Sequence, residues 1–503
     1  MKVGLAGIGL DTYWPQFPGL KDRLVCYQQK IADTLSGLDT QFGDASRDAR
    51  GRDMRDCSVH VVDVGLIDSP QKAKEAATLF RTGDIDALFI YVATYALSHT
   101  VLPIAQAVDA PIIILNLQPS PTIDYESFNA LGDRWKMTGE WLANCQACSV
   151  PEIASVFNIA GIKYDIITGW LDDDEAWCQI SEWIKALNAK KTIRDARIGI
   201  LGHYYAGMLD VYTDVTRLAA VFGSHFELLE MDSLASLRRD ICARGSGDSP
   251  SPQTTGTDKV KAKILQFSEE FDVSPACPEE EIRRAAITAC ALDDLVRQHD
   301  LSALAYYYEG VAGNESETIV SSVIAGNTLL TAHHVPVAGE CEVKNVVAMK
   351  ILDSLGAGGS FSEFYYSDFS DNVVLLGHDG PAHPAIAEGA VHLVPLNVYH
   401  GKPGKGLSIQ MSVRHGPVTL LSVVQGAHGE TFLLAAEGES VPGPIFQIGN
   451  TNSRYRFPIA AKDFINTWSK AGPAHHCAIG LGHLAGILQK LAMSLGIECR
   501  VVC

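Results

Sequence analysis

Short apolar runs alternate with amphipathic segments through most of the first 330 residues of this 503-residue chain. The apolar runs predict strands at residues 3–6, 61–64, 87–92 and 112–115. The amphipathic segments predict helices at residues 71–80, 99–108 and 130–145. Because strands that alternate with helices form βαβ units, this pattern predicts a parallel sheet with helices on its faces.

The same alternation starts again after Pro151. Strands are expected at residues 155–159, 198–201, 226–229 and 303–307. Helices are expected at residues 172–189, from about 209, at 259–270 and at 278–299. Glu309 directly follows the strand at 303–307, and ligands of open α/β sheets gather at that end of a strand. Glu309 is therefore a candidate substrate-binding residue.

The pattern changes after residue 330. One helix is predicted at 342–355, and alternating strands follow at 407–413, 418–425 and 431–436, joined by glycine-containing turns. A helix at 481–495 and a strand at 499–502 close the chain. Such strands are typical of an antiparallel sheet or barrel. We predict two Rossmann-like or flavodoxin-like α/β domains, 1–170 and 171–330, and a mixed, β-rich, barrel-like domain at 331–503.

The charge balance restricts the class of partner. There are 59 acidic and 40 basic residues, so the formal net charge is −19. Nucleic acids and anionic lipid surfaces both attract basic faces, and we expect neither as a partner. No run reaches the length of a membrane helix, and the first ten residues are expected to form a strand and not a signal peptide. The twelve cysteines lack the spacing of a disulfide scaffold, which favours a reducing, cytoplasmic location.

Several familiar motifs are absent or incomplete. Gly4, Gly7 and Gly9 follow the first strand, but two prolines interrupt the helix that would receive a pyrophosphate. The glycines therefore give little support to an NAD-dependent dehydrogenase. Cys145 and Cys148 form a single CxxC, which we interpret as two ordinary thiols. The pair His333–His334 is interpreted as part of a loop or an interface.

Residues 339–378 hold the most informative side chains. This segment contributes Glu340, Glu342, Glu363 and His378, and the adjacent pair His475–His476 follows downstream in a small-residue segment. Carboxylates and imidazoles together suit Mn²⁺, with Co²⁺ and Fe²⁺ as competitors, better than they suit Zn²⁺. Four such ligands leave two octahedral positions open, enough room for two neighbouring oxygens of a ligand such as O1 and O2 of a sugar. The alternative is that these are ordinary residues of surface turns.

Four segments resemble the L-arabinose isomerase family, with the L-fucose isomerases as more distant relatives. They read GECEVK from Gly339, GGSFSE from Gly358, GH at residues 377–378 and AHH from Ala474. Their order matches the family pattern, and their separations are similar. The interval from Glu340 to Glu363 is about one helical turn shorter than is usual in the family.

The resemblance implies an aldose–ketose isomerase of L-arabinose or a related sugar. It implies that Glu340, Glu363, His378 and His476 bind the metal. Glu340 and Glu363 would also be the acid/base pair, and the residues leave open both enediol proton transfer and a metal-assisted hydride shift. His475 would orient or contact the substrate.

The resemblance also implies substrate-binding residues outside the metal site. It further implies that the protein forms an oligomer. Gln118, in the segment NLQPS, corresponds to a substrate-facing glutamine of the family. After the first strand the chain reads GLDTYW, so Asp11 or Tyr13 takes the place of another family glutamine. Family members form trimers or hexamers, and we expect a homo-oligomer. A non-catalytic sugar-binding or regulatory protein of the same fold is the alternative hypothesis.

Overall fold

The computed structural model describes residues 1–38, 58–243, 256–309, 313–399 and 402–503. The described residues form two compact units, one up to Asn188 and one from Ala189 to the end. The three-domain division with boundaries at 170 and 330 stays a prediction.

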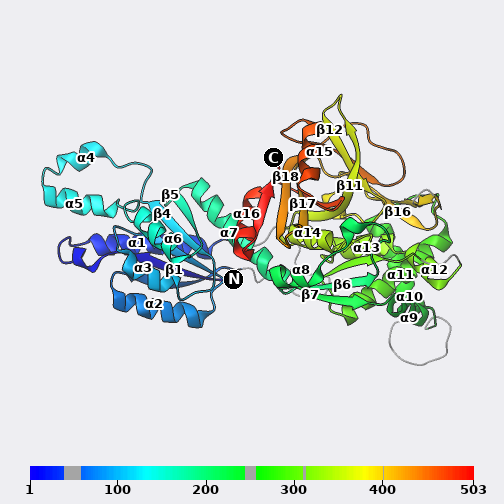
Figure 1. Ribbon diagram of the computed structural model, residues 1–503, viewed down its shortest axis with the longest axis horizontal. Helices are drawn as coiled ribbons and strands as arrows, with labels where there is room; N and C mark the ends of the chain where they lie inside the picture. Colours follow the sequence, from blue (N-terminus) through cyan, green and yellow to red (C-terminus); the bar gives the residue numbers. More distant parts are fainter. Residues whose placement is uncertain (39–57, 244–255, 310–312, 400–401) are drawn as a thin grey trace. The chain divides into compact units, whose positions relative to one another are not determined.

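The first unit is built on a five-stranded parallel sheet in the order β2-β1-β3-β4-β5 (Figure 1). Its strands are β1 (Lys2–Ile8), β2 (His60–Ile67), β3 (Ala87–Val92), β4 (Ile112–Gln118) and β5 (Tyr164–Trp170). This strand order is the flavodoxin-like one, with a switch point between β1 and β3. The predicted parallel sheet is therefore confirmed for this unit.

The helices of this part of the chain are mostly short. They are η1 (Asp11–Tyr13), α1 (Leu20–Ser36), α2 (Pro70–Gly83), α3 (Ser98–Ala105), α4 (Tyr125–Ala130), α5 (Arg134–Ala143), α6 (Val150–Ala160) and α7 (Asp174–Arg194). The strand predicted at 155–159 is wrong, because these residues belong to α6. That helix buries Ile153 and Phe157, which lie four residues apart on one helical face.

The second unit contains a four-stranded parallel sheet in the order β10-β9-β6-β7. The strands are β6 (Arg197–Gly202), β7 (His225–Leu229), β9 (Ala303–Tyr307) and β10 (Val337–Ala338). The helices of this part are η2 (Leu209–Val211), α8 (Val215–Phe222), α9 (Met231–Ala243), α10 (Gly256–Glu270), α11 (Glu279–Gln298), α12 (Glu315–Val320) and α13 (Ile324–Ala332). The order reverses between β6 and β9, which makes their carboxyl ends a switch point.

Seven strands of the second unit form a largely antiparallel sheet that closes on itself. Its order is β17-β20-β11-β12-β19-β18-β21, and β17 also pairs with β18 (Figure 1). The strands are β11 (Gly358–Asp368), β12 (Val373–His378), β17 (Gly416–Gln425), β18 (Thr431–Val441), β19 (Thr451–Arg456), β20 (His476–Leu481) and β21 (Glu498–Val501). The predicted barrel-like architecture is therefore confirmed.

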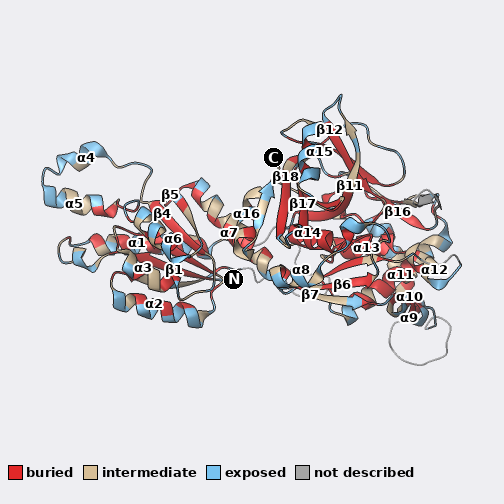
Figure 2. Ribbon diagram, in the orientation of Figure 1, coloured by how far each residue is buried: buried red, intermediate tan, exposed pale blue. Residues whose placement is uncertain are grey.

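Smaller elements complete the second unit. They are β8 (Asp272–Val273), β13 (His392–Pro395), β14 (Val398–Tyr399), β15 (Lys402–Pro403), β16 (Leu407–Gln410), η3 (Pro384–Ile386), α14 (Val343–Ser354), α15 (Ala461–Lys470) and α16 (Ala485–Leu495). Helix α14 is buried along nearly its whole length, as Figure 2 shows. It contacts β9 and β10 of the parallel sheet and also β11, β17 and β20 of the closed sheet. One hydrophobic core therefore serves both sheets.

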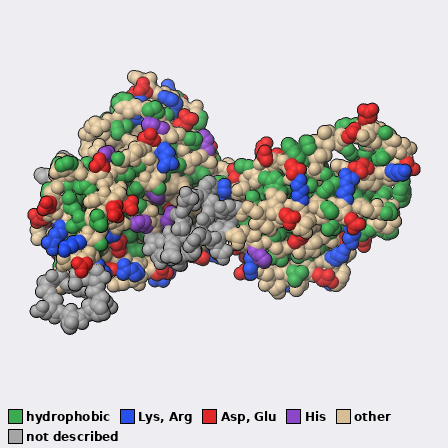
Figure 3. All heavy atoms as spheres, turned by 180° about the vertical axis from the view of Figure 1, so that it is seen from behind, with side chains coloured by type: hydrophobic (Ala, Val, Ile, Leu, Met, Phe, Trp, Pro, Cys, Tyr) green, Lys and Arg blue, Asp and Glu red, His purple; other side chains and the backbone are tan. Residues whose placement is uncertain are grey.

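The exposed surface mixes charges of both signs. Acidic and basic side chains are interspersed over the face seen in Figure 3. Such mixing keeps a protein with a large net charge free of extended single-sign fields. Among the described residues, no helix combines the length and the apolar character that a membrane crossing requires.

Candidate metal centre

A strained turn after β10 carries the first carboxylate. Glu340 and Cys341 both have left-handed backbone conformations, with φ of +54° and +58°. Each such residue costs on the order of 1–3 kcal/mol, and strain of this kind clusters at functional sites. The turn is closed by hydrogen bonds from the N–H of Cys341 to the carbonyl of Tyr306 and from the N–H of Glu342 to that of Gly339. It places Glu340 at the carboxyl end of the parallel sheet.

The strand register of the closed sheet brings three more side chains together. On β11, Glu363 pairs with Gly377 of β12 on one side and with His476 of β20 on the other. His378 is the next residue after Gly377. His476 is the first residue of β20, so the segment predicted as a loop becomes a strand at this histidine.

The resulting group is the carboxylate–histidine cluster, made of Glu340, Glu363, His378, His475 and His476. The Oε2 atom of Glu340 lies 3.4 Å from Nε2 of His476 and 3.6 Å from Nε2 of His475. Its Oε1 atom lies 3.9 Å from Nε2 of His378. The Oε2 atom of Glu363 lies 3.9 Å from Nε2 of His475. Three ligand atoms lie within 4.8 Å of one another in each of two sets, Glu340–His475–His476 and Glu363–His378–His476.

The two carboxyls lie in different electrostatic environments. Burial raises the pKa of Glu363 to about 7, and the charge of His475 only partly opposes this. Burial acts in the same direction on Glu340, but close contact with His475 and the charges of the neighbouring histidines lower its pKa below the usual value. Glu340 therefore favours the ionised form, whereas Glu363 exchanges a proton near neutral pH.

The two adjacent histidines are also unlike each other. His476 is fully buried, and this burial lowers its pKa to about 3, so its ring is neutral near neutral pH. Burial also disfavours the charged form of His475, but the close carboxylate of Glu340 and a hydrogen bond with Asp210 raise its pKa to about 9. One ring therefore offers a lone pair, and the other carries a positive charge beside two carboxyls.

A third carboxylate, that of Glu342, lies next to the cluster on the side of His476. Glu342 is fully buried, and its Oε2 atom lies 3.8 Å from Nδ1 of His476. Its Oε1 atom lies 3.3 Å from Nζ of Lys344, which is also buried. Burial raises the pKa of Glu342 to about 7 against the opposing charge of Lys344. Glu342 thus faces the ring nitrogen of His476 that points away from Glu340, without a hydrogen bond to it.

The polar atoms of the cluster fit a divalent cation. In the described part of the chain, Oε2 of Glu340 and both ring nitrogens of His476 are buried and make no hydrogen bond. Buried polar atoms without a partner are costly, about 1–3 kcal/mol each, so their presence here calls for a ligand. Carboxylate oxygens and neutral imidazole nitrogens are the donors that Mn²⁺, Fe²⁺ and Co²⁺ accept.

Phe361 and Gly359 of the GGSFSE segment shape the site from within. The ring of Phe361 lies 4.4 Å from the ring centres of both His378 and His476, which limits how these rings turn. Gly359 has φ of +104°, and a Cβ atom there would lie 2.5 Å from the carbonyl oxygen of Met349. The glycine therefore allows β11 to approach the backbone of α14.

The other predicted substrate residues lie at the carboxyl ends of strands or just beyond them. Gln118 is the last residue of β4, and Asp11 and Tyr13 lie in η1 just after β1. All three belong to the first unit, at the carboxyl edge of its sheet. Glu309 lies in the second unit, two residues beyond β9, and its charge and that of Glu340 both act on Tyr307. The structure thus brings together the predicted metal residues and His475 in one unit.

Asp210, Lys344 and Phe361 were not among the predicted site residues. Lys344 and Phe361 stand inside the motif segments, two residues from Glu342 and Glu363, and their position in the motif was the available signal. Asp210 lies in η2 and accepts hydrogen bonds from His475, 265 residues away. No local pattern in the sequence marks it.

The chain is similar over part of its length to two sugar isomerases. No family model matches the chain. A sulfoquinovose isomerase from Alkalicoccus urumqiensis is 20% identical over 286 residues, which cover 56% of this chain and 59% of that protein. An L-arabinose isomerase from Nocardioides sp. (strain ATCC BAA-499 / JS614) is 22% identical over 364 residues, which cover 70% of this chain and 68% of that protein. The chain is a distant relative of L-arabinose isomerase. The resemblance drawn from the motif segments is therefore confirmed.

Proposed function

We propose that this relative of L-arabinose isomerase is a metal-dependent aldose–ketose isomerase. The observation that supports it most is the convergence of Glu340, Glu363, His378 and His476 from four separate segments into one cluster, in which all but Glu363 are buried. These four residues would hold Mn²⁺, with Co²⁺ or Fe²⁺ as alternatives. Both similar proteins are named as sugar isomerases.

The reaction moves hydrogen between two neighbouring carbons of an open-chain sugar. A bound divalent cation supplies polarisation of the carbonyl group. One carboxylate removes the proton from C2 and returns it to C1, while the other moves a proton between O2 and O1. Glu363 is the more accessible of the two carboxylates to a substrate, because its side chain is 32% exposed, compared with 8% for Glu340. His475, at the open side of the cluster, would contact the sugar oxygens.

The test is an isomerisation assay with Mn²⁺ on a panel of aldoses, followed by proton NMR. The panel includes L-arabinose and sulfoquinovose, because the two relatives are named for these sugars. We expect turnover of at least one sugar, and we expect Glu363→Gln to abolish it while the protein remains folded. Full activity of Glu363→Gln, or no turnover of any sugar by the unaltered protein, would refute the proposal.

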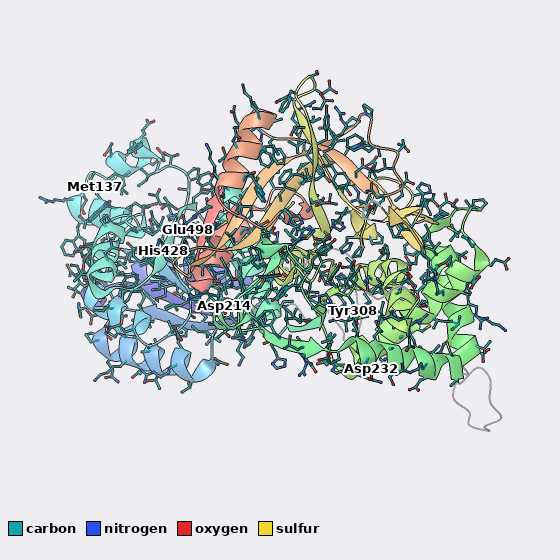
Figure 4. All side chains as sticks on the ribbon, turned by 45° about the vertical axis from the view of Figure 1, so that its right-hand side comes forward. Met137, Asp214, Asp232, Tyr308, His428 and Glu498 are labelled. Atoms are coloured by element: carbon teal, nitrogen blue, oxygen red, sulfur yellow. The ribbon has the colours of Figure 1, made fainter. Side chains whose placement is uncertain are left out.

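A matched control uses a glutamate of the same unit away from the cluster. Glu498, labelled in Figure 4, lies at the start of β21, and its side chain is 61% exposed. The change Glu498→Gln removes the same charge without touching the cluster. It should retain full activity.

A further inference from the structure

One carboxylate oxygen holds both the backbone and the ring of His475. The Oδ2 atom of Asp210 accepts a hydrogen bond from the backbone N–H of His475 at 3.0 Å. The same oxygen lies 2.6 Å from Nδ1 of the ring. Because an ionised carboxylate only accepts hydrogen bonds, Nδ1 carries the hydrogen of this contact. Asp210 lies in η2, after β6, whereas His475 directly precedes β20.

The other ring nitrogen faces the two carboxyls of the cluster. Nε2 of His475 lies 3.6 Å from Oε2 of Glu340 and 3.9 Å from Oε2 of Glu363. A turn of the ring away from this position would break the contact at Nδ1. A carboxylate that accepts from one nitrogen of an imidazole sets the orientation in which the other nitrogen acts.

Asp210 is itself fixed by a buried lysine. Nζ of Lys344 donates a hydrogen bond to the backbone carbonyl of Asp210 at 2.6 Å. It also lies 3.4 Å from the carbonyl of Tyr212 and 3.5 Å from Oγ1 of Thr213. Only 5% of the Lys344 side chain is exposed, so this contact is shielded from solvent. The segment that carries Asp210 is thereby attached to the first turn of α14.

We propose that Asp210 is a positioning residue that holds His475 with Nε2 between Glu340 and Glu363. Asp210 does not reach the reacting atoms and acts through His475. The expected effect of Asp210 on turnover rests on the proposed function, in which His475 contacts the sugar oxygens. The expected effect of Asp210 on the orientation of the His475 ring is independent of that function.

The direct test is structural and needs no activity. In crystal structures of the whole chain, Asp210→Ala should release the His475 ring from its position. Asp210→Asn keeps an oxygen acceptor at the same place, and the ring should stay. A His475 ring that keeps Nε2 between the two carboxyls in Asp210→Ala would overturn the proposal.

A kinetic cycle tests how the effect is transmitted. Asp210→Ala and His475→Ala should each lower kcat by about 10–100-fold, the usual effect of losing a partner behind a functional histidine. The double variant should lose no more than His475→Ala alone, because both changes remove one interaction. KM should change less than kcat. Losses that multiply in the double variant would overturn the proposal.

The control is another aspartate of the same segment. Asp214, labelled in Figure 4, caps α8 by accepting a hydrogen bond from the N–H of Arg217. Asp214→Ala removes a helix cap and should leave kcat unchanged. If the unaltered protein isomerises no sugar, the proposed function fails, and the crystal structures alone decide the role of Asp210.

Discussion

The ion pair between Lys350 and Asp353 is buried inside the second unit, where removal of one partner should have a large effect. Nζ of Lys350 lies 2.8 Å from Oδ2 of Asp353, and only 7% and 3% of these side chains are exposed. The ring of His334 adds a contact of 2.8 Å to Oδ1 of Asp353. Lys350 also donates to the carbonyl of His334. The group anchors the last turns of α14.

The expected magnitude follows from this geometry. With an effective dielectric constant of about 20, two unit charges 2.8 Å apart attract each other by about 6 kcal/mol. Part of this attraction offsets the cost of burying the charges. Asp353→Ala leaves Lys350 buried without its counter-charge, which typically destabilises by about 3–5 kcal/mol. We expect a loss of that size in the free energy of unfolding of the second unit.

The assay must report on the second unit alone. Six of the seven tryptophans precede residue 189, so fluorescence mostly follows the first unit. Pulsed hydrogen exchange of the peptide 343–354 along a urea series reports on α14 instead. Asp195→Ala is the matched control, because the pair Arg194–Asp195 is exposed and such pairs contribute only about 0–1 kcal/mol.

A further variant tests the reasoning. Lys350→Met combined with Asp353→Ala should be more stable than Asp353→Ala alone, since no charge remains buried without a partner. A loss below about 1 kcal/mol for Asp353→Ala would refute the argument, as would a double variant no more stable than the single one.

Three more predictions concern pH, metal and backbone. Burial would raise the pKa of Asp353, but Lys350 and the neighbouring histidines hold it well below the usual value. Its contribution is thus complete above the unfolded pKa, and the difference in unfolding free energy between the unaltered protein and Asp353→Ala should shrink below about pH 4. A difference that stays constant to lower pH would contradict this. Mn²⁺ at one hundred times its dissociation constant should stabilise the second unit by about 2.7 kcal/mol, measured by calorimetry. His476→Ala should show a smaller gain at the same concentration, and an equal gain would exclude His476 as a ligand. Gly359→Ala should destabilise by about 1–3 kcal/mol in urea unfolding, because it adds a Cβ atom against α14 at a positive φ. A neutral effect would show that the backbone can move there.

Local pattern was enough to predict most elements, because the apolar period distinguishes strands from helices. The predicted helix at 278–299 matches α11 (Glu279–Gln298) within a residue or two at each end. The prediction failed at 155–159, where β-branched and aromatic residues favour a strand but the helix buries one face against the sheet. The helix predicted at 130–145 begins later, since Gly132 is left-handed and Asp133 caps a new helix, α5, at Arg134.

The sequence by itself determined which residue types the candidate site contains. The motif segments carry Glu340, Glu363, His378 and His476, and carboxylates and imidazoles are residue types that a divalent cation accepts as ligands. The two glutamates are also suited to proton transfer, because a carboxylate can bind a metal ion and can also accept or donate a proton. None of this depends on distances.

Only the tertiary structure decided which side chains meet and what each one does. The register of β11 with β12 and β20 places Glu363 beside His378 and His476, and register is a property of paired strands, not of one segment. Burial raises the pKa of Glu363 and lowers that of His476, and burial depends on every element packed around them. Asp210 became a partner of His475 because two distant loops converge beside the closed sheet. Contacts over such separations come from packing, which no local pattern encodes.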